Sequence, residues 1–170
     1  MIFSRRLRGL FHLSKKNTQL LSNTLKTPST YKKELIQKIN SAEFSSDTNY
    51  FIFVDLSNFK TNIFKGSYKK WVLEKSYLCT IGKVTEPTIT GYYKLGPKGY
   101  SFGEPRGFAC YYYCQIKGNY LFHSIPYYLD GTIKDSRLGV QGTDGCIRLA
   151  TEHAKWLYDN VPSTSTVYIC

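Results

Sequence analysis

Alternating apolar and polar positions dominate the chain from Tyr50 onward. In residues 50–56 (Y-F-I-F-V-D-L) both faces of the alternation are largely apolar, which is typical of a strand buried inside a sheet. Shorter runs with the same period of two follow along the chain. They predict strands at residues 60–64, 71–76, 77–80, 108–115 and 120–122. Many short strands at this spacing indicate a mainly β protein of the sandwich type.

Two glycine-containing segments between these strands predict turns. Residues 96–99 (G-P-K-G) have the composition of a turn. Residues 117–119 (K-G-N) lie between two strand patterns and predict a hairpin. Such a hairpin would put His123 at the end of a strand, where its side chain can face a site.

Helical periodicity predicts helices on either side of the strands. One is expected over residues 31–43, where apolar side chains recur every three or four positions. Another is expected to begin with Thr151 as its N-cap, with Glu152 in the first turn where the helix dipole favours a negative charge. Pro162 would end it. The expected buried stripe of this second helix is Ala154, Leu157 and Val161.

The first thirty residues have a different pattern, in which a few large apolar side chains are spaced by arginine and lysine. Phe3, Leu7, Leu10 and Phe11 recur at helical spacing and predict a basic amphipathic helix. Three interpretations are open: a membrane-surface or targeting segment, a solvated arm, and the remnant of a longer chain. We favour the solvated arm, and we expect a helical arm and linker over residues 1–45 and a β domain over residues 46–170.

The charge of the chain is concentrated in its first part. The formal net charge is +11, but residues 1–40 alone hold nine Lys/Arg and one Glu, so the remainder is only mildly basic. A folded domain that binds nucleic acid would need a denser basic stripe, so we expect no nucleic-acid partner. The basic arm is instead a candidate for contact with an anionic wall polymer or a membrane surface. It lacks the uninterrupted apolar core of a clear signal peptide.

The number and spacing of the cysteines limit which disulfides and metal sites are possible. There are five, an odd number, so at least one is free or paired between molecules, and Cys146 is our candidate for the free one. If residues 108–115 form a strand, the sulfurs of Cys110 and Cys114 lie roughly 13 Å apart, too far to bond or share one zinc ion. No Cys/His cluster has zinc-ligand spacing, and no glycine-rich phosphate motif is present. We therefore expect no metal and no cofactor.

The candidate chemistry lies in residues 139–149 (G-V-Q-G-T-D-G-C-I-R-L) and in a histidine upstream. Glycines on both sides of Cys146 can present its sulfur on an open turn at the mouth of a short strand. The thiolate is the reactive form of cysteine, so thiol catalysis needs a base. His123, in the run N-Y-L-F-H-S, is the candidate base, because an imidazole with a pKa of about 6.5 suits this task.

The order and spacing of five segments resemble the L,D-transpeptidase catalytic domain family, the YkuD-like fold. The resemblance covers about 125 residues, from Asn49 to the C-terminus, and the blocks around the histidine and the cysteine are specific. The segments are V-D-L-S (54–57), C-T-I-G (79–82), E-P-T-I-T-G-Y-Y (86–93), G-N-Y-L-F-H-S (118–124) and G-T-D-G-C-I-R-L (142–149). The resemblance implies a β-sandwich with mixed sheets and one or two packed helices.

The resemblance also implies an activity. Cys146 would attack a diaminoacyl carbonyl in a peptidoglycan stem tetrapeptide, expel the terminal D-alanine and pass the acyl group to an amine, with His123 as general base. The family orients this histidine with a backbone carbonyl, here that of Ser124. The N–H groups of Gly145 and Cys146 are candidate oxyanion donors. The expected substrate-binding residues are Arg148, Thr143 and Asp144. The resemblance therefore implies an enzyme of cell wall biogenesis and cell shape. It would be located outside the cytoplasm, at the wall or membrane surface.

One position departs from the family pattern. Relatives usually have Ser/Thr-His-Gly-Cys, and this chain has Asp144 where they carry histidine. A carboxylate beside a thiol raises the thiol pKa, which works against activation unless Arg148 or protonated His123 offsets it. Two alternatives to acyl transfer therefore stay open. One is an L,D-carboxypeptidase that hydrolyses the same bond, and the other is a wall-binding module with impaired chemistry.

Overall fold

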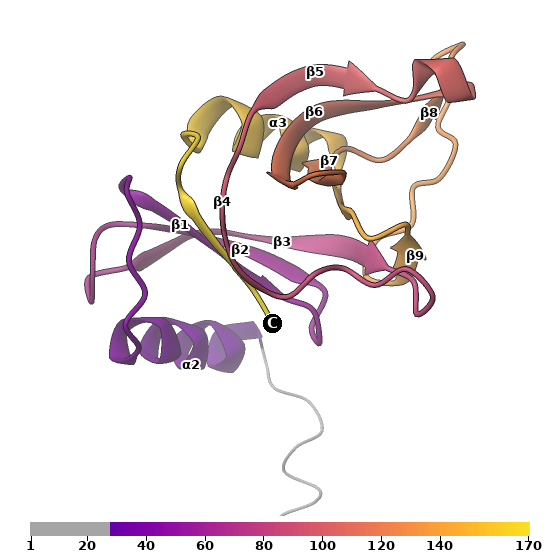
Figure 1. The fold of residues 1–170 in the computed structure, drawn as a ribbon. Coiled ribbons are helices and arrows are strands. Elements are labelled where there is room, and N and C mark those ends of the chain that lie inside the picture. Colours follow the sequence, from indigo (N-terminus) through magenta and orange to yellow (C-terminus); the bar gives the residue numbers. More distant parts are fainter. Residues whose placement is uncertain (1–27) are drawn as a thin grey trace, which may run out of the picture. The chain divides into compact units, whose positions relative to one another are not determined.

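The computed structural model describes residues 28–170 (Figure 1). The chain divides into two compact units, residues 1–35 and residues 36–170, and every strand of the described residues lies in the second. The basic amphipathic helix expected near the N-terminus lies outside the described residues. Helix α2, Pro28–Ser41, agrees with the helix expected over residues 31–43. No helix among the described residues is both long and apolar enough to cross a membrane.

The eleven strands of the described residues form one hydrogen-bonded sheet, in which nine strands follow one another in a continuous path. Its order is β4-β11-β1-β2-β3-β10-β7-β6-β5, with β8 paired to β6 and β9 paired to β3. The strands are β1 Tyr50–Asp55, β2 Lys60–Lys65, β3 Val72–Gly82, β4 Gly91–Lys94, β5 Lys98–Phe102, β6 Phe108–Lys117, β7 Tyr120–His123, β8 Tyr127–Tyr128, β9 Gln141–Thr143, β10 Ile147–Leu149 and β11 Thr166–Ile169.

The pairing is mixed, as expected. The pairs β1 with β11, β10 with β7 and β3 with β9 are parallel, and the other pairs are antiparallel. Figure 1 shows β1 to β3 in one layer and β5 to β7 in another, with α3, Thr151–Asn160, beside the second layer. The mainly β sandwich with mixed sheets and two helices is therefore confirmed.

The core draws side chains from both layers. Ile52 and Val54 of β1, Phe122 of β7 and Leu157 of α3 belong to one buried cluster and have no measurable exposure. Burying one such side chain contributes about 1.5–3 kcal/mol, so this cluster is the main force that holds β7 and α3 onto the first layer.

The segment before the strands is tied to the sheet of its own unit. The amide of Asn40 accepts a hydrogen bond from the Trp71 N–H at 2.7 Å and donates one to the Trp71 carbonyl at 2.8 Å. The indole N–H of Trp71 donates to the Phe44 carbonyl at 3.0 Å, and the Phe44 ring stacks on Phe51 with centroids 4.9 Å apart. These contacts cross the expected boundary at residue 45, which remains a proposal.

Three local expectations were wrong. Residues 71–76 and 77–80 are not two strands, because β3 runs unbroken along β2 and its backbone groups stay paired. Lys98 and Gly99 belong to β5 rather than to a turn, because they pair with Cys114 and Tyr113 of β6. Thr151 is not the N-cap of α3 either. Ala150 is, without a side-chain cap, and the Thr151 hydroxyl instead lies 2.6 Å from the Tyr127 hydroxyl.

Candidate active site

The cysteine lies on a glycine turn that connects two short strands. The turn joins β9 to β10, and Gly145 adopts φ +97°, a left-handed conformation that favours glycine. A side chain at Gly145 would meet the Tyr120 ring at 2.5 Å, so the close approach also requires glycine. The Thr143 hydroxyl donates to the Cys146 carbonyl at 2.5 Å and closes the turn. Cys146 is thus presented immediately before β10, as expected.

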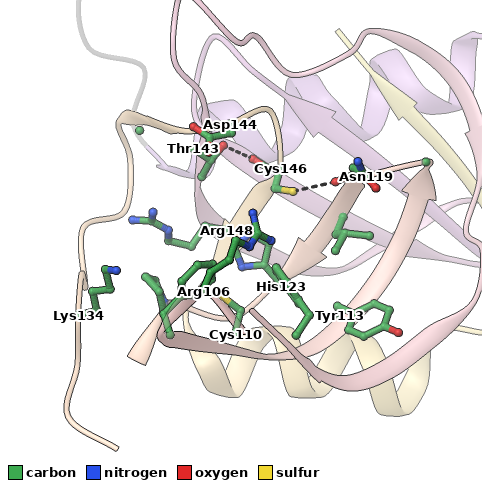
Figure 2. Close-up of a pocket in the computed structure, with 16 residues that line it drawn as sticks. Arg106, Cys110, Tyr113, Asn119, His123, Lys134, Thr143, Asp144, Cys146 and Arg148 are labelled. Atoms are coloured by element: carbon green, nitrogen blue, oxygen red, sulfur yellow. Dashed lines mark hydrogen bonds between the residues drawn. The ribbon is translucent and has the colours of Figure 1, made fainter. Parts of the chain in front are cut away.

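The histidine is brought beside the cysteine by the parallel pairing of β7 and β10. His123 is the last residue of β7, as expected, and it pairs with Arg148 of β10. Cys146 lies two residues before Arg148, so it projects from the same face, and the Cα atoms of Cys146 and His123 are roughly 8 Å apart. Both side chains line one cavity of about 740 Å³ (Figure 2).

The imidazole of His123 is oriented by a backbone carbonyl. Its Nδ1 lies 2.6 Å from the carbonyl oxygen of Ser124. A carbonyl can only accept, so Nδ1 carries the proton in the neutral ring and Nε2 keeps a free lone pair. Ser124 is itself held to β6, because its N–H donates to the Tyr111 carbonyl at 3.0 Å and its hydroxyl accepts the Tyr111 N–H at 2.8 Å.

Burial sets the protonation state of this ring. Removal from water lowers the pKa of His123 to about 4, against the opposing effect of the Ser124 carbonyl, and the charge of Arg148 lowers it further. The Phe102 ring packs edge-on against the imidazole with centroids 5.3 Å apart. His123 is therefore neutral at pH 7 and available as a proton acceptor.

Cys146 is half-buried and rests as a neutral thiol. Its Sγ donates to the Asn119 carbonyl at 3.2 Å (Figure 2). Burial raises the pKa of Cys146 above its usual value, and Asp144 adds to this, whereas a hydrogen bond from the Leu121 backbone and the charge of Arg106 oppose it. The resting pair is a neutral thiol and a neutral imidazole rather than a thiolate and an imidazolium.

The carboxylate of Asp144 is occupied by a lysine that sequence analysis did not single out. Lys83 Nζ lies 2.8 Å from Asp144 Oδ1 and 2.7 Å from Glu86 Oε2. The Lys83 hydrogen bond is the main cause that lowers the pKa of Asp144, so this carboxylate is ionised at neutral pH. The cation that compensates Asp144 is Lys83, not Arg148 as we had considered.

Arg148 faces the cavity from β10 but already has an acidic partner. Its guanidinium donates to Asp135 Oδ2 at 2.7 Å, and the arginine is only 7% exposed. Arg137 also binds Asp135, with Nε 2.9 Å from Oδ1. Arg137, and then Arg148, lower the pKa of Asp135 well below its usual range. The ion pair of Arg148 and Asp135 fastens the loop after β8 to β10, the strand that follows the cysteine.

The other cysteines differ from Cys146 in access or environment. All five are free, in agreement with the expected separation of Cys110 from Cys114. Burial raises the pKa of Cys79, Cys110 and Cys114 to about 12, so these three thiols are inert. Cys170, at the end of the described residues, is exposed. Across residues 28–170 no three His, Cys, Asp or Glu side chains gather closely enough to hold a metal ion.

Four further residues line the cavity, and the sequence pattern assigned none of them a role in the site. Asn119, Arg106, Lys134 and Tyr113 line it together with the cysteine and the histidine. They come from a hairpin, a 3-10 turn, a loop and a strand, and nothing in their local spacing marks them as a group.

Comparison with known families agrees with this geometry. A family model described as the L,D-transpeptidase catalytic domain, YkuD, matches residues 49–169, which contain the whole cavity. The chain belongs to this family. Among curated proteins, the "Putative L,D-transpeptidase YciB" of Bacillus subtilis (strain 168) is 40% identical over 55 residues, which are 31% of this chain and 28% of YciB.

Solved structures support the same family fold. A protein of Clostridium acetobutylicum ATCC 824, described as a fused Zn-dependent amidase/peptidase/peptidoglycan-binding domain-containing protein, aligns with a TM-score of 0.71 and 31% identity, over 91% of this chain and 74% of that one. An L,D-transpeptidase from Stackebrandtia nassauensis aligns with a TM-score of 0.60 and 16% identity, over 79% of this chain and 64% of that one. The second likeness concerns the fold alone.

Proposed function

We propose that this YkuD domain is a cysteine-dependent L,D-transpeptidase that acts on peptidoglycan stem peptides. The observation that carries the proposal is the His123 ring, held by the Ser124 carbonyl at 2.6 Å in a cavity that Cys146 also lines. A neutral imidazole with a free Nε2 is the form needed to take a thiol proton. The family match supports the reaction class.

The acylation step begins when the Cys146 thiol leaves the Asn119 carbonyl and gives its proton to Nε2 of His123. The sulfur attacks the diaminoacyl carbonyl and forms a tetrahedral oxyanion, to which the N–H groups of Gly145 and Cys146 donate. Collapse breaks the C–N bond to D-alanine, and the imidazolium returns its proton to the leaving amine. The product is a thioester on Cys146 and free D-alanine.

The second step reverses the first with a new amine. The acceptor amine loses a proton to His123 and attacks the thioester, and the sulfur leaves and recovers the proton. Because the pKa of His123 is lowered and that of Cys146 is raised, a preformed thiolate–imidazolium pair is disfavoured. Proton transfer then accompanies attack, so the rate depends on how well the bound peptide aligns with the sulfur.

The proposed location is the cell wall, outside the cytoplasm, because that is where a stem-peptide substrate occurs. Residues 46–170 would hold the whole activity. The basic arm, which we propose contacts anionic wall polymer or membrane surface, lies largely outside the described residues.

Intact-mass spectrometry with a stem tetrapeptide tests the function. We expect a mass gain equal to the tetrapeptide minus one free D-alanine on the wild type and on Cys170→Ser, and none on Cys146→Ala. Adding an acceptor peptide should release a cross-linked product. Release of the tripeptide acid instead would identify an L,D-carboxypeptidase. Tetrapeptide binding with neither an adduct nor turnover would indicate a binding module and refute the enzymatic proposal.

A further inference from the structure

Two cations of the cavity have no acidic partner within the described part of the chain. The charged residues that line the cavity are Arg106, Lys134, Arg148 and Asp144. Arg148 is paired with Asp135, and Asp144 is paired with Lys83. No ion pair joins Arg106 or Lys134 to another residue in the range 28–170. The cavity wall therefore carries an excess of positive charge.

Both cations are held over one aromatic ring. Arg106 Cζ lies 5.3 Å and Lys134 Nζ 5.1 Å from the centre of the Phe108 ring, and Lys134 Nζ is also 5.5 Å from the centre of the Tyr128 ring. Each such contact contributes about 0.5–1 kcal/mol at an exposed site. The Phe108 ring thus places two positive charges on one part of the cavity wall, where an anion can approach both.

The backbone positions of both cations are restrained. Arg106 ends a 3-10 turn, Glu104–Arg106, between Gly103 at φ +101° and Gly107 at φ +79°. A Cβ atom at Gly103 would lie 2.5 Å from the Phe108 ring, so glycine lets the turn fold against that ring.

Lys134 is fixed on both sides. Its N–H donates to the Pro126 carbonyl at 3.0 Å, and the preceding Ile133 bridges to Tyr127 of β8. The following residue, Asp135, is held by Arg148 at 2.7 Å. Arg148 therefore positions the loop that carries Lys134, and Figure 2 shows Lys134 on that loop at the side of the cavity.

The charge of Arg106 also acts on the reacting centre. It lowers the pKa of both Cys146 and Asp144, which places its guanidinium within electrostatic range of the sulfur. In the proposed substrate, the terminal D-alanine carboxylate lies about 4 Å from the scissile carbonyl carbon. Arg106 and Cys146 line the same cavity, so an anion bound near Arg106 shares that cavity with a carbonyl at the sulfur.

We propose that Arg106 and Lys134 bind the C-terminal carboxylate of the donor peptide and so select a chain that ends one residue after the scissile bond. This inference rests on the proposed function. Arginine and lysine bind carboxylates through charge-assisted hydrogen bonds. Blocking the terminus as an amide removes this interaction, and one additional residue moves the carboxylate about 3.6 Å farther away.

Equilibrium binding to a Cys146→Ala background tests the proposal without chemistry. The probes are one synthetic stem tetrapeptide with its terminal D-alanine as the acid and as the amide, titrated calorimetrically up to millimolar concentration. We expect the acid to bind about 10–100-fold more tightly than the amide, equivalent to about 1.4–2.8 kcal/mol. Arg106→Gln with Lys134→Gln should make the two probes equal and leave amide binding unchanged. Lys70→Gln, which removes an exposed positive charge from a loop outside the cavity, should preserve the preference for the acid.

An acid-to-amide ratio that survives in the double variant would overturn the carboxylate site, as would the absence of binding by either probe. Thermal unfolding of each variant checks that the fold is retained. Acylation of Cys146 in the wild type is a separate measurement. If the wild type is acylated but the double variant keeps the acid-to-amide affinity ratio, only the carboxylate site is refuted. If the double variant loses that ratio but the wild type is not acylated, only the enzymatic proposal is refuted.

Discussion

Asp144, which stands where relatives carry histidine, is bound by Lys83 at 2.8 Å and is thereby compensated by a positive charge. Both side chains are largely exposed, so their pairing contributes little to stability. Its consequence is electrostatic, because Asp144 is one of the groups that raise the pKa of Cys146. The charge of Lys83 therefore reduces the effect of Asp144 on the pKa of Cys146.

Lys83→Gln should therefore raise the thiol pKa of Cys146, and Asp144→His should lower it. The measurement is the rate of Cys146 alkylation by iodoacetamide from pH 6 to 10, in a Cys170→Ser background that removes the other accessible thiol. The Asp144→His variant should react faster at low pH and converge with the parent at high pH. Identical profiles for all three proteins would show that the sulfur does not sense this pair.

The pH dependence of turnover should reflect the buried state of His123. We expect kcat/KM to fall only as the pH approaches about 4, because protonation of the ring removes the base there. The His123→Ala variant should be slower, with a residual rate that climbs with pH as thiolate forms without a base. Initial rates after return to pH 7 control for unfolding. An acidic limb near 6.5 in the wild type would contradict the burial argument.

The free energy of unfolding should change with pH because of the same histidine. The unfolded chain binds a proton at His123 below about pH 6.5, whereas the folded protein binds it only near pH 4. Folding is therefore increasingly penalised as the pH falls from 6.5 to 4, by about 3 kcal/mol in total. Urea unfolding of the wild type and of His123→Gln at pH 7, 5.5 and 4.5 should show a shallower loss in the variant. Parallel losses would indicate that other groups dominate.

Asp135 and Arg148 should behave as a partly buried pair, because their side chains are 20% and 9% exposed. Asp135→Asn leaves the guanidinium of Arg148 without its countercharge and should lower the free energy of unfolding by on the order of 3 kcal/mol. The double variant Asp135→Leu with Arg148→Met should recover most of that loss, because two apolar side chains need no partner. Chemical denaturation measures both. Equal stability of the wild type and Asp135→Asn would show that the pair is solvated.

Truncation should locate the boundary of the domain. Residues 36–170 are expected to fold, whereas residues 45–170 lack Phe44 and the two hydrogen bonds between Asn40 and Trp71. Removing a buried phenylalanine costs about 3–5 kcal/mol, so the shorter chain should unfold at a markedly lower temperature. Asn40→Ala within residues 36–170 isolates the part due to hydrogen bonds. Equal melting temperatures for the two truncated chains would support the boundary at residue 45.

Local patterns were enough to predict the elements that carry the site. The period of two over residues 50–56 and 120–122 and the hairpin at residues 117–119 correspond to β1, β7 and the turn between β6 and β7. Apolar alternation and turn composition are properties of neighbouring residues, so they can be read before the chain folds. The glycines around Cys146 and the position of His123 at a strand end are of the same kind.

The partners of the site residues were not predictable in this way. Lys83 is 61 positions from Asp144, and the carbonyl that accepts from the Cys146 thiol belongs to Asn119, 27 positions away. Arg148 was expected to face a substrate carboxylate, and its pairing with Asp135 depends on the path of the loop after β8. The lowered pKa of His123 likewise results from burial, and the extent of burial cannot be predicted from neighbouring residues.

The failed local expectations have the same origin. The continuity of β3, the strand start at Lys98 and the bond from Thr151 to Tyr127 each depend on a partner strand or side chain that is distant in sequence. Periodicity reports which face of an element is apolar. Which charges meet, which carbonyl holds a thiol and how far a ring is removed from water depend on how the elements pack, because those interactions join segments that the sequence keeps far apart.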